Sequence, residues 1–261
     1  MKARDYWNAN LDTDNLSRRS GAAHPDIGQA AAFASTPEFE WLRGRLRLQR
    51  AGAAEPGLLI DIGGGVGMHA ILWAREGMQV VVVDPATDRL KALRELARQA
   101  GVADSILFVA GCAESLPVRD GSADACFTKA VLIHTDLSVA ARDIHRVLRP
   151  GGQGLFIEPL NRNPLIRLYR SWFAPRIWRS ITRYFDQSAI DELRAPFERL
   201  RWKPFYLVSA GSFVWQYGLK RPAFFRRSLR RWMRLDAWLL RKFEGLELWC
   251  WFAAMEVRKS R

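Results

Sequence analysis

The sequence predicts an α/β protein with a doubly wound, mostly parallel sheet that carries helices on both faces. Short apolar runs of strand length alternate with helical patterns between residues 55 and 160. The first of these runs ends in a turn with glycine at every second position, Gly63, Gly65 and Gly67. Ligands of such sheets bind beyond the carboxyl ends of the strands, where this turn lies.

The order of elements follows from periodicity and from turn residues. Strands are expected at 58–62, 78–84, 105–111, 123–133 and 154–159, and helices at about 67–76, 88–101 and 137–148. Gly101 ends the second helix. The sequence "RPGG" at 149–152 breaks the third helix before the strand "GLFIEP" begins.

Composition changes near Pro159. Residues 160–261 hold 22 Lys and Arg against 8 Asp and Glu, whereas residues 1–159 hold 18 against 19. Eight of the eleven tryptophans also lie after residue 159. The chain of 261 residues is therefore expected to form one core followed by a specialised basic lobe.

Several kinds of protein are excluded by what the sequence lacks. The first ten residues have no apolar segment of the signal-peptide kind, and no run of 18 apolar residues occurs, so a cytoplasmic location is expected. The three cysteines, Cys112, Cys126 and Cys250, are far apart and have no histidine at ligand spacing. We therefore expect neither a metal site nor disulfides.

The spacing of the glycine turn indicates the ligand. The dinucleotide pattern GxGxxG starting at Gly63 needs glycine at position 68, where the chain has Met68. The sequence is instead DxGxGxG from Asp61, with a second acid, Asp84, at the end of the next strand. A carboxylate there can accept both ribose hydroxyls of an adenosine, at about 1.5–3 kcal/mol for each charge-assisted bond.

Five segments together resemble a known family. They are "LLIDIGGGVG", "VVVVDPA", "GCAESLPVRDGSADACF", "VLIH" and "RVLRPGGQGLFIEP". Over about residues 55–160 the chain resembles the class I S-adenosylmethionine (SAM)-dependent methyltransferases, in particular the small-molecule branch with quinone and sterol methyltransferases. The resemblance implies a seven-stranded Rossmann-like sheet, SAM as cofactor, S-adenosylhomocysteine as product and a small-molecule acceptor.

The resemblance also implies a cofactor site. Its residues would be Asp61, Gly63, Gly65 and Gly67 for the methionine end, Asp84 and Pro85 for the ribose, Cys112, Ala113 and Glu114 for the adenine edge, and Thr128 and Lys129 near the ammonium group. Cys112 stands where the family usually has an acid that accepts from the adenine amino group. A thiol accepts weakly, so this contact is lost or passes to Glu114 at a cost of about 1 kcal/mol.

Two residues are candidates for catalysis. The resemblance places His134 beside the acceptor pocket, and an imidazole with a pKa near 6.5 suits a general base. Glu158, at the end of the fifth strand, would bind or deprotonate the acceptor or stabilise a cationic intermediate. The alternatives are a structural or helix-capping role for His134 and an ion pair with a neighbouring arginine for Glu158.

Further segments are assigned by resemblance. Residues 1–54 are expected to form an N-terminal helical lid, 55–160 the SAM-binding core and 161–261 a substrate-side lobe. Within this lobe we expect a lid at 161–199, strand six at about 201–209, an amphipathic insertion at about 210–245 and the last strand at 246–259.

The insertion allows three interpretations. On a helical wheel, apolar residues from Phe225 to Phe243 share one arc, which only Asp236 interrupts, and seven basic residues share the other. The helix either packs on the protein with a solvated basic face, lies on an anionic membrane surface through residues 222–244, or clamps a substrate phosphate. The membrane interpretation would place the protein at the inner membrane face.

Two other functions compete with small-molecule methylation. Basic and aromatic residues also suit a nucleic-acid methyltransferase, but the chain lacks the DPPY or NPPY tetrad and the Pro-Cys dipeptide of those enzymes. A non-catalytic SAM-binding protein is the other alternative, against which the acids Asp61 and Asp84 argue.

Overall fold

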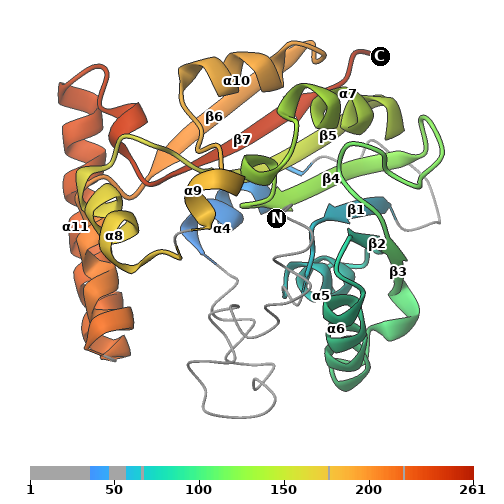
Figure 1. Cartoon of the computed structure of the whole chain (residues 1–261), viewed down its shortest axis with the longest axis horizontal. Coiled ribbons are helices and arrows are strands. Elements are labelled where there is room, and N and C mark those ends of the chain that lie inside the picture. The colour runs from blue at the N-terminus through green and yellow to red at the C-terminus, as the bar shows by residue number, and fades with distance from the viewer. Residues whose placement is uncertain (1–35, 47–56, 66–67, 176, 220) are drawn as a thin grey trace.

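The computed structural model describes residues 36–46, 57–65, 68–175, 177–219 and 221–261. Most of the expected N-terminal lid, as well as Gly67, lies outside these residues. Seven strands form one sheet in the order β3-β2-β1-β4-β5-β7-β6, with helices on both of its faces (Figure 1). The predicted fold class, a doubly wound and mostly parallel sheet, is confirmed.

The strands are β1 (Leu58–Ile62), β2 (Gln79–Asp84), β3 (Ile106–Ala110), β4 (Ala123–Lys129), β5 (Leu148–Pro159), β6 (Arg199–Phe205) and β7 (Phe252–Arg258). The helices are α4 (Pro37–Arg43), α5 (His69–Arg75), α6 (Thr87–Gln99), α7 (Leu137–Val147), α8 (Pro164–Phe173), α9 (Trp178–Ile181), α10 (Gln187–Arg194) and α11 (Pro222–Lys242). Short helical turns include η3 (Leu132–His134), η4 (Ser209–Ser212), η5 (Val214–Gly218) and η6 (Glu247–Trp249). Strands β1 to β5 pair in parallel, whereas β7 is antiparallel to both of its neighbours.

The sequence "RPGG" does not separate α7 from β5 as predicted. Strand β5 begins at Leu148, and its register with β4 shifts between the pairs Ala123↔Leu148 and Ala125↔Gln153. Gly151 allows this irregular stretch because it has a φ of 74°, a left-handed conformation that side chains disfavour. The bulge keeps the "RPGG" segment within the strand.

Two apolar layers cover the sheet. One joins α4, α5 and α6 to the sheet around Phe39, Trp73 and Phe127, all about 1% exposed. The other joins α7 and α10 to the opposite face, with Ile144 and Leu193 fully buried. These layers hold the carboxyl ends of β1, β2 and β4 in fixed positions at one edge of the sheet.

Helix α11 is part of the connection from β6 to β7, and one carboxylate anchors it. Asp236 is 5% exposed and accepts hydrogen bonds from the backbone of Leu207, Val208 and Ser209 and from the Ser209 hydroxyl. The acid that interrupts the apolar arc of the wheel therefore points into the protein. Within the described residues, no helix is long and apolar enough to span a membrane.

Candidate active site

The turn after β1 brings bare backbone to the edge of the sheet. Gly63 and Gly65 have φ values of 67° and 51°. A side chain at Gly63 would collide with Val131, and one at Gly65 would crowd the Arg89 guanidinium, with a Cβ 3.2 Å from its Nε. Glycine is therefore required here both by conformation and by space.

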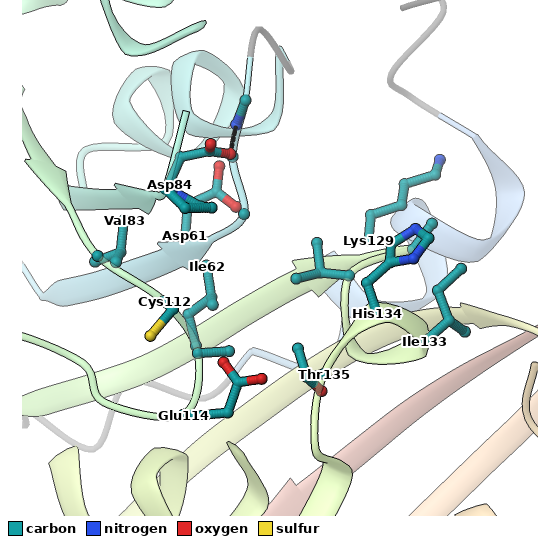
Figure 2. Close-up of a pocket in the computed structure, with 18 of the residues that line it drawn as sticks. Asp61, Ile62, Val83, Asp84, Cys112, Glu114, Lys129, Ile133, His134 and Thr135 are labelled. Carbon is teal, nitrogen blue, oxygen red and sulfur yellow. Dashed lines mark hydrogen bonds between the residues drawn. The ribbon is translucent and has the colours of Figure 1, made fainter. Parts of the chain in front are cut away.

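Asp84 fastens this turn to the end of β2. Its Oδ2 accepts from the Gly65 amide at 2.9 Å and its Oδ1 from the Ala86 amide at 2.8 Å. An ionised carboxylate can accept more than two hydrogen bonds, which makes Asp84 a candidate acceptor for a ligand hydroxyl as well as for these amides. Figure 2 shows the Asp84 and Asp61 carboxyl groups close together at this edge.

Asp61 supplies an acceptor that the protein does not satisfy. Its Oδ2 is buried and has no hydrogen-bond partner among the described residues. Burial, together with the charge of Asp84, raises the pKa of Asp61 to about 8. A cationic ligand group would offset both causes of this shift.

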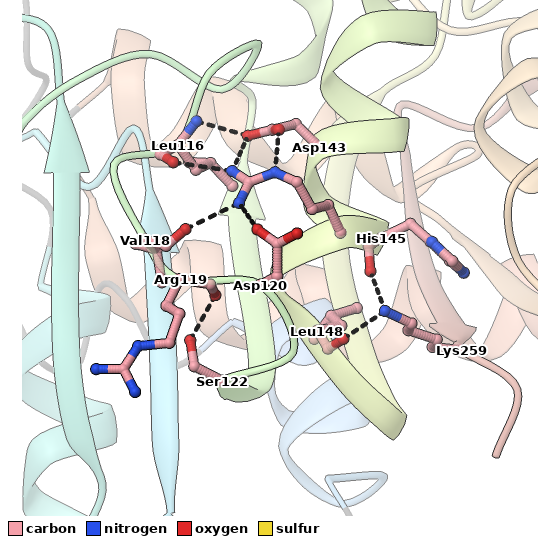
Figure 3. Close-up of polar contacts among 10 residues, drawn as sticks. Leu116, Val118, Arg119, Asp120, Ser122, Asp143, His145, Leu148 and Lys259 are labelled. Atoms are coloured by element: carbon pink, nitrogen blue, oxygen red, sulfur yellow. Dashed lines mark hydrogen bonds and ion pairs between the residues drawn. The ribbon is translucent and has the colours of Figure 1, made fainter.

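Cys112, Ala113 and Glu114 line the same cavity from the loop after β3. Glu114 accepts from the Asp136 amide at 3.1 Å, and the Cys112 thiol is exposed. The chain that follows is held by Arg146, which donates to Asp143, Asp120 and the backbone oxygens of Leu116 and Val118 (Figure 3). This loop is therefore fixed to α7.

Thr128 and Glu158 do not line the cavity. The Thr128 hydroxyl donates to Glu158 Oε1 at 3.0 Å, and the same oxygen accepts from the amides of Val131 and Leu132 at 3.2 and 3.1 Å. Burial raises the pKa of Glu158 to about 7. The structure thus places Glu158 beneath the segment that follows β4, outside the cavity lining and without an ion pair to a described arginine.

Lys129 lines the cavity and pairs with the N-terminal helix. Its Nζ lies 3.2 Å from Glu38 Oε1 and 3.3 Å from Thr36 Oγ1. The Tyr206 hydroxyl donates to the other Glu38 oxygen at 2.5 Å. Both Glu38 and Tyr206 are 2% exposed. The cluster joins α4, the end of β4 and the residue after β6.

His134 ends η3 and holds a second segment over the cavity. Its Nδ1 lies 2.9 Å from the backbone oxygen of Ile181, which can only accept, so the hydrogen is assigned to Nδ1. Arg183 donates its amide to the Ile133 oxygen at 2.7 Å. Burial lowers the pKa of His134, which keeps the imidazole neutral at pH 7. In this tautomer Nε2 is the basic nitrogen.

Some cavity residues were missed by the sequence analysis. His69, which was not selected, begins α5 and lines the cavity, with its ring between those of Phe39 and Phe127 at 5.0 Å from each. Other lining residues that were not selected include Ile62, Arg89, Val131, Thr135 and the segment 180–183. The only sequence feature that could have predicted His69 as a lining residue is its place just after the glycine turn.

Together these groups surround a cavity of about 990 Å³. Of the predicted site residues, it is lined by Asp61, Gly63, Gly65, Asp84, Pro85, Cys112, Ala113, Glu114, Lys129 and His134. Its volume is at the upper end of the range for small-molecule sites, which leaves room for a cofactor and an acceptor. No cluster of metal-ligating side chains occurs in the described parts of the chain.

Comparison with known proteins decides the family. Residues 60–156 match the model of a methyltransferase domain. The ubiquinone/menaquinone biosynthesis C-methyltransferase UbiE of Rubrivivax gelatinosus is 30% identical over 183 residues, which cover 62% of this chain and 70% of that protein. The chain belongs to the class I SAM-dependent methyltransferases.

Other members of this methyltransferase family extend the comparison. UbiE of Pectobacterium carotovorum is 34% identical over 119 residues, 44% of this chain, and the match spans about half of that relative's length, 47%. Among solved structures, the geranyl diphosphate C-methyltransferase of Streptomyces coelicolor A3(2) has a TM-score of 0.60 and 15% identity, with 98% of this chain and 96% of that one covered. At that identity the likeness shows the fold.

The observed site fits the SAM cofactor of these methyltransferases. Asp61 offers an unsatisfied buried oxygen to the ammonium group, and Asp84 offers acceptor positions to the ribose hydroxyls. The bare backbone at Gly65 lets a ligand approach the turn. These residues are the ones we propose to hold SAM.

The affinity for SAM is expected to rise at least tenfold between pH 6 and pH 8. Asp61, with a pKa of about 8, must lose its proton to pair with the ammonium group, so binding below pH 8 includes the cost of that deprotonation. Titration calorimetry at pH 6, 7 and 8 measures the change. The variant Asp61→Asn should bind more weakly at pH 8 and with little pH dependence. A flat profile for the unaltered protein would remove Asp61 as the ammonium partner.

Proposed function

We propose that this chain transfers the methyl group of SAM to a hydrophobic small molecule of the quinone-, prenyl- or other lipid-like class, including phosphate-bearing forms. The observation that carries the proposal is the continuity of the cavity. It runs from the cofactor turn at Gly63 and Gly65 to an acceptor side formed by Val131, Ile133 and Ile181. The lining also holds polar side chains, among them Lys129, Thr135 and Arg183. An apolar wall that carries several placed polar groups is typical of small-molecule sites.

The names of related proteins support this class of acceptor. UbiE of Rubrivivax gelatinosus is named for quinone biosynthesis and for C-methylation. The Streptomyces coelicolor structure contains geranyl diphosphate, a prenyl compound that carries phosphate. Arg183 lines the acceptor side and offers a positive charge at its edge, although it also pairs with Glu192 at 2.8 Å. The acceptor proposed for this chain combines these features.

His134 is proposed as the general base. SAM, when bound, supplies an electrophilic methyl group, so the protein has only to align the acceptor and remove its proton where it carries one. With Nδ1 donating to the Ile181 oxygen, Nε2 is the basic nitrogen of this tautomer and would take the acceptor proton. The same hydrogen bond fixes the 180–183 segment, so His134 would also position one wall of the acceptor side.

Replacing His134 with glutamine is expected to slow turnover about a hundredfold, within the usual contribution of a general base. The affinity for SAM should change less than threefold, because the cofactor groups at Asp61 and Asp84 are intact. Transfer of labelled methyl at saturating SAM measures turnover, and titration calorimetry measures binding. His145→Gln is the matched control, since His145 lies on α7 outside the cavity lining. Unchanged turnover in His134→Gln would exclude His134 as the base.

We also propose that the acceptor is met at an anionic membrane surface, and that the protein works in the cytoplasm or on the inner membrane face. A basic lobe that follows the core supports this proposal.

The alternative function, methylation of nucleic acid, would use the same lobe to bind phosphates along the strand. A non-catalytic SAM-binding protein is the other alternative.

A label-transfer survey tests the proposed function. The purified protein is incubated with methyl-labelled SAM and host extract, and the products are separated into organic-soluble, small polar and nucleic-acid fractions. We expect label in the organic fraction, and no label there with Asp84→Ala. Label in nucleic acid would overturn the choice of acceptor, and SAM binding without any label would indicate a binding protein.

A further inference from the structure

Helix α8 has an apolar face that the described residues leave exposed. Leu165, Leu168, Tyr169 and Trp172 follow one another at the spacing of a single helix face and are 49%, 51%, 54% and 73% exposed. Phe173, 70% exposed, stacks on Tyr169 at a ring distance of 5.7 Å. Soluble monomers seldom expose such a contiguous group of large apolar side chains without a partner.

Helix α11 presents a basic face with further apolar side chains. Arg227, Arg230, Arg231 and Arg234 are exposed, line a shallow hollow of about 230 Å³ and form no ion pair with a described residue. On the same outward side, Phe224, Leu235 and Trp238 are 51%, 44% and 46% exposed. The helix has one acid, Asp236, which is turned inward, so nothing on the outward face offsets the positive charge.

The topology brings both helices to the edge of the sheet that holds the cavity. Strands β5 and β6 are both antiparallel to β7 and therefore run in the same direction. Their carboxyl ends lie at the edge where β1 and β4 end, α8 follows β5, and α11 follows β6 through η4 and η5. Both helices pack on η4. Figure 1 shows them together beyond the ends of these strands.

The segment that follows α8 connects its exposed face with the lining of the cavity. Phe173 ends α8, and only a few residues later Ser180 and Ile181 of α9 line the cavity. The segment that follows the exposed face of α8 in the sequence therefore forms part of the acceptor side of the cavity. Helices α5, α6 and α7 lie elsewhere on the molecule, away from α8 and α11 (Figure 1).

We infer that the exposed apolar face of α8 and the arginine face of α11 together form a docking surface for an anionic lipid bilayer. Phosphate headgroups would contact Arg227, Arg230, Arg231 and Arg234, and the aromatic side chains of both helices would enter the headgroup boundary. The apolar arc from Phe225 to Leu240 is half-buried against the protein and is not the docking face. Only one part of this inference rests on the proposed function, namely that the acceptor comes from the bilayer.

Sedimentation with vesicles tests the inference on the full chain. We expect binding to vesicles of phosphatidylcholine with phosphatidylglycerol, and at least tenfold weaker binding to phosphatidylcholine alone. The variant R227E/R230E/R231E/R234E should lose at least a hundredfold in partitioning to the anionic vesicles, because each basic residue near the headgroups adds to the attraction. W172A/F173A should partition about tenfold less.

The matched control carries the same change of charge on other helices. R75E/K91E/R98E/R142E alters four exposed residues of α5, α6 and α7 and should keep vesicle binding within threefold of the unaltered protein. SAM binding by calorimetry confirms that each variant is folded. Binding that is absent, independent of lipid charge, or weakened equally by the control variant would overturn the docking surface. SAM binding and label transfer that persist in that case would leave the proposed methyl transfer standing and would remove only the proposed membrane surface.

Discussion

Replacing Asp84 with alanine is expected to weaken SAM binding at least a hundredfold. Two charge-assisted hydrogen bonds to the ribose hydroxyls, at about 1.5–3 kcal/mol each, would be lost together. The same carboxylate accepts from the Gly65 and Ala86 amides, so the substitution also releases the glycine turn from β2. Titration calorimetry with SAM measures the effect, and thermal unfolding without SAM reports how much of it is structural.

Two further variants separate ribose binding from the support of the turn. Asp84→Asn keeps one oxygen that can accept from a backbone amide but loses the charge and one acceptor, so its affinity should lie between those of the alanine variant and the unaltered protein. Asp88→Ala changes an exposed acid on α6 that pairs with Lys91 and should leave SAM binding unchanged. An affinity of Asp84→Ala equal to that of the unaltered protein would refute the ribose assignment.

Replacing Glu158 with alanine is expected to lower the free energy of unfolding by about 3 kcal/mol or more. The Thr128 hydroxyl and the amides of Val131 and Leu132 would lose their shared acceptor inside the protein, and each unsatisfied buried donor costs about 1–3 kcal/mol. For a chain of this size the melting temperature should fall by about 6–12 °C. Calorimetric unfolding measures it.

The conservative variant Glu158→Gln tests the positioning role. Glutamine keeps an oxygen for the three donors, so it should restore most of the stability, to within about 1 kcal/mol of the unaltered protein. Because the segment that these donors belong to carries Val131 and His134 into the cavity, Glu158→Ala should also raise the KM for the acceptor, and the glutamine variant should recover it. Equal effects of the two substitutions would contradict this role and favour direct action of the carboxylate.

Local patterns predicted the core of the fold well. The strands β1 to β3 and the helices α5 to α7 alternate with clear periods, and the glycine turn and Asp84 are close to strand ends. The fourth strand was predicted at 123–133 but ends at Lys129, because Leu132–His134 form η3. The start of β5 was missed because the bulge at "RPGG" depends on pairing with β4, which one segment does not reveal. The last strand was predicted at 246–259 but begins at Phe252, since Glu247–Trp249 form η6. Strand six was predicted at about 201–209 but is β6 at Arg199–Phe205, and Ser209–Ser212 form η4.

The residues of the site also divide into those that local sequence predicted and those that depend on tertiary contacts. Asp61, Gly65 and Asp84 belong to one contiguous β-turn-α-β stretch, so their spacing and the family resemblance of that stretch predicted them as one site. His69 and the 180–183 segment reach the cavity through tertiary contacts, with Phe39 and with the His134 segment respectively. Glu158 was selected as a candidate for acceptor chemistry, but its donors sit across a strand pair that spacing does not show.

The helical wheel for α11 separated the apolar and basic residues correctly, but it did not show what surrounds each of them. It marked Asp236 as an interruption of an apolar face, whereas this acid is where the helix attaches to the backbone of residues 207–209. A buried carboxylate that accepts several amide hydrogens is indistinguishable in a single sequence from an exposed one. The side of α11 that faces the protein can be assigned only when the position of residues 207–209 is known.

The pairing of Phe205 with Phe252 has a consequence for how this protein can be altered. The connection 206–251 joins two adjacent strands that are hydrogen-bonded to each other. The pairing of β6 with β7 would therefore be the same if a shorter loop joined them. The entropy of closing such a connection changes slowly with its length. A replacement for this connection would need no new strand register, but it would have to keep the buried Tyr206, which donates to Glu38, and an acceptor for the amides of residues 207–209.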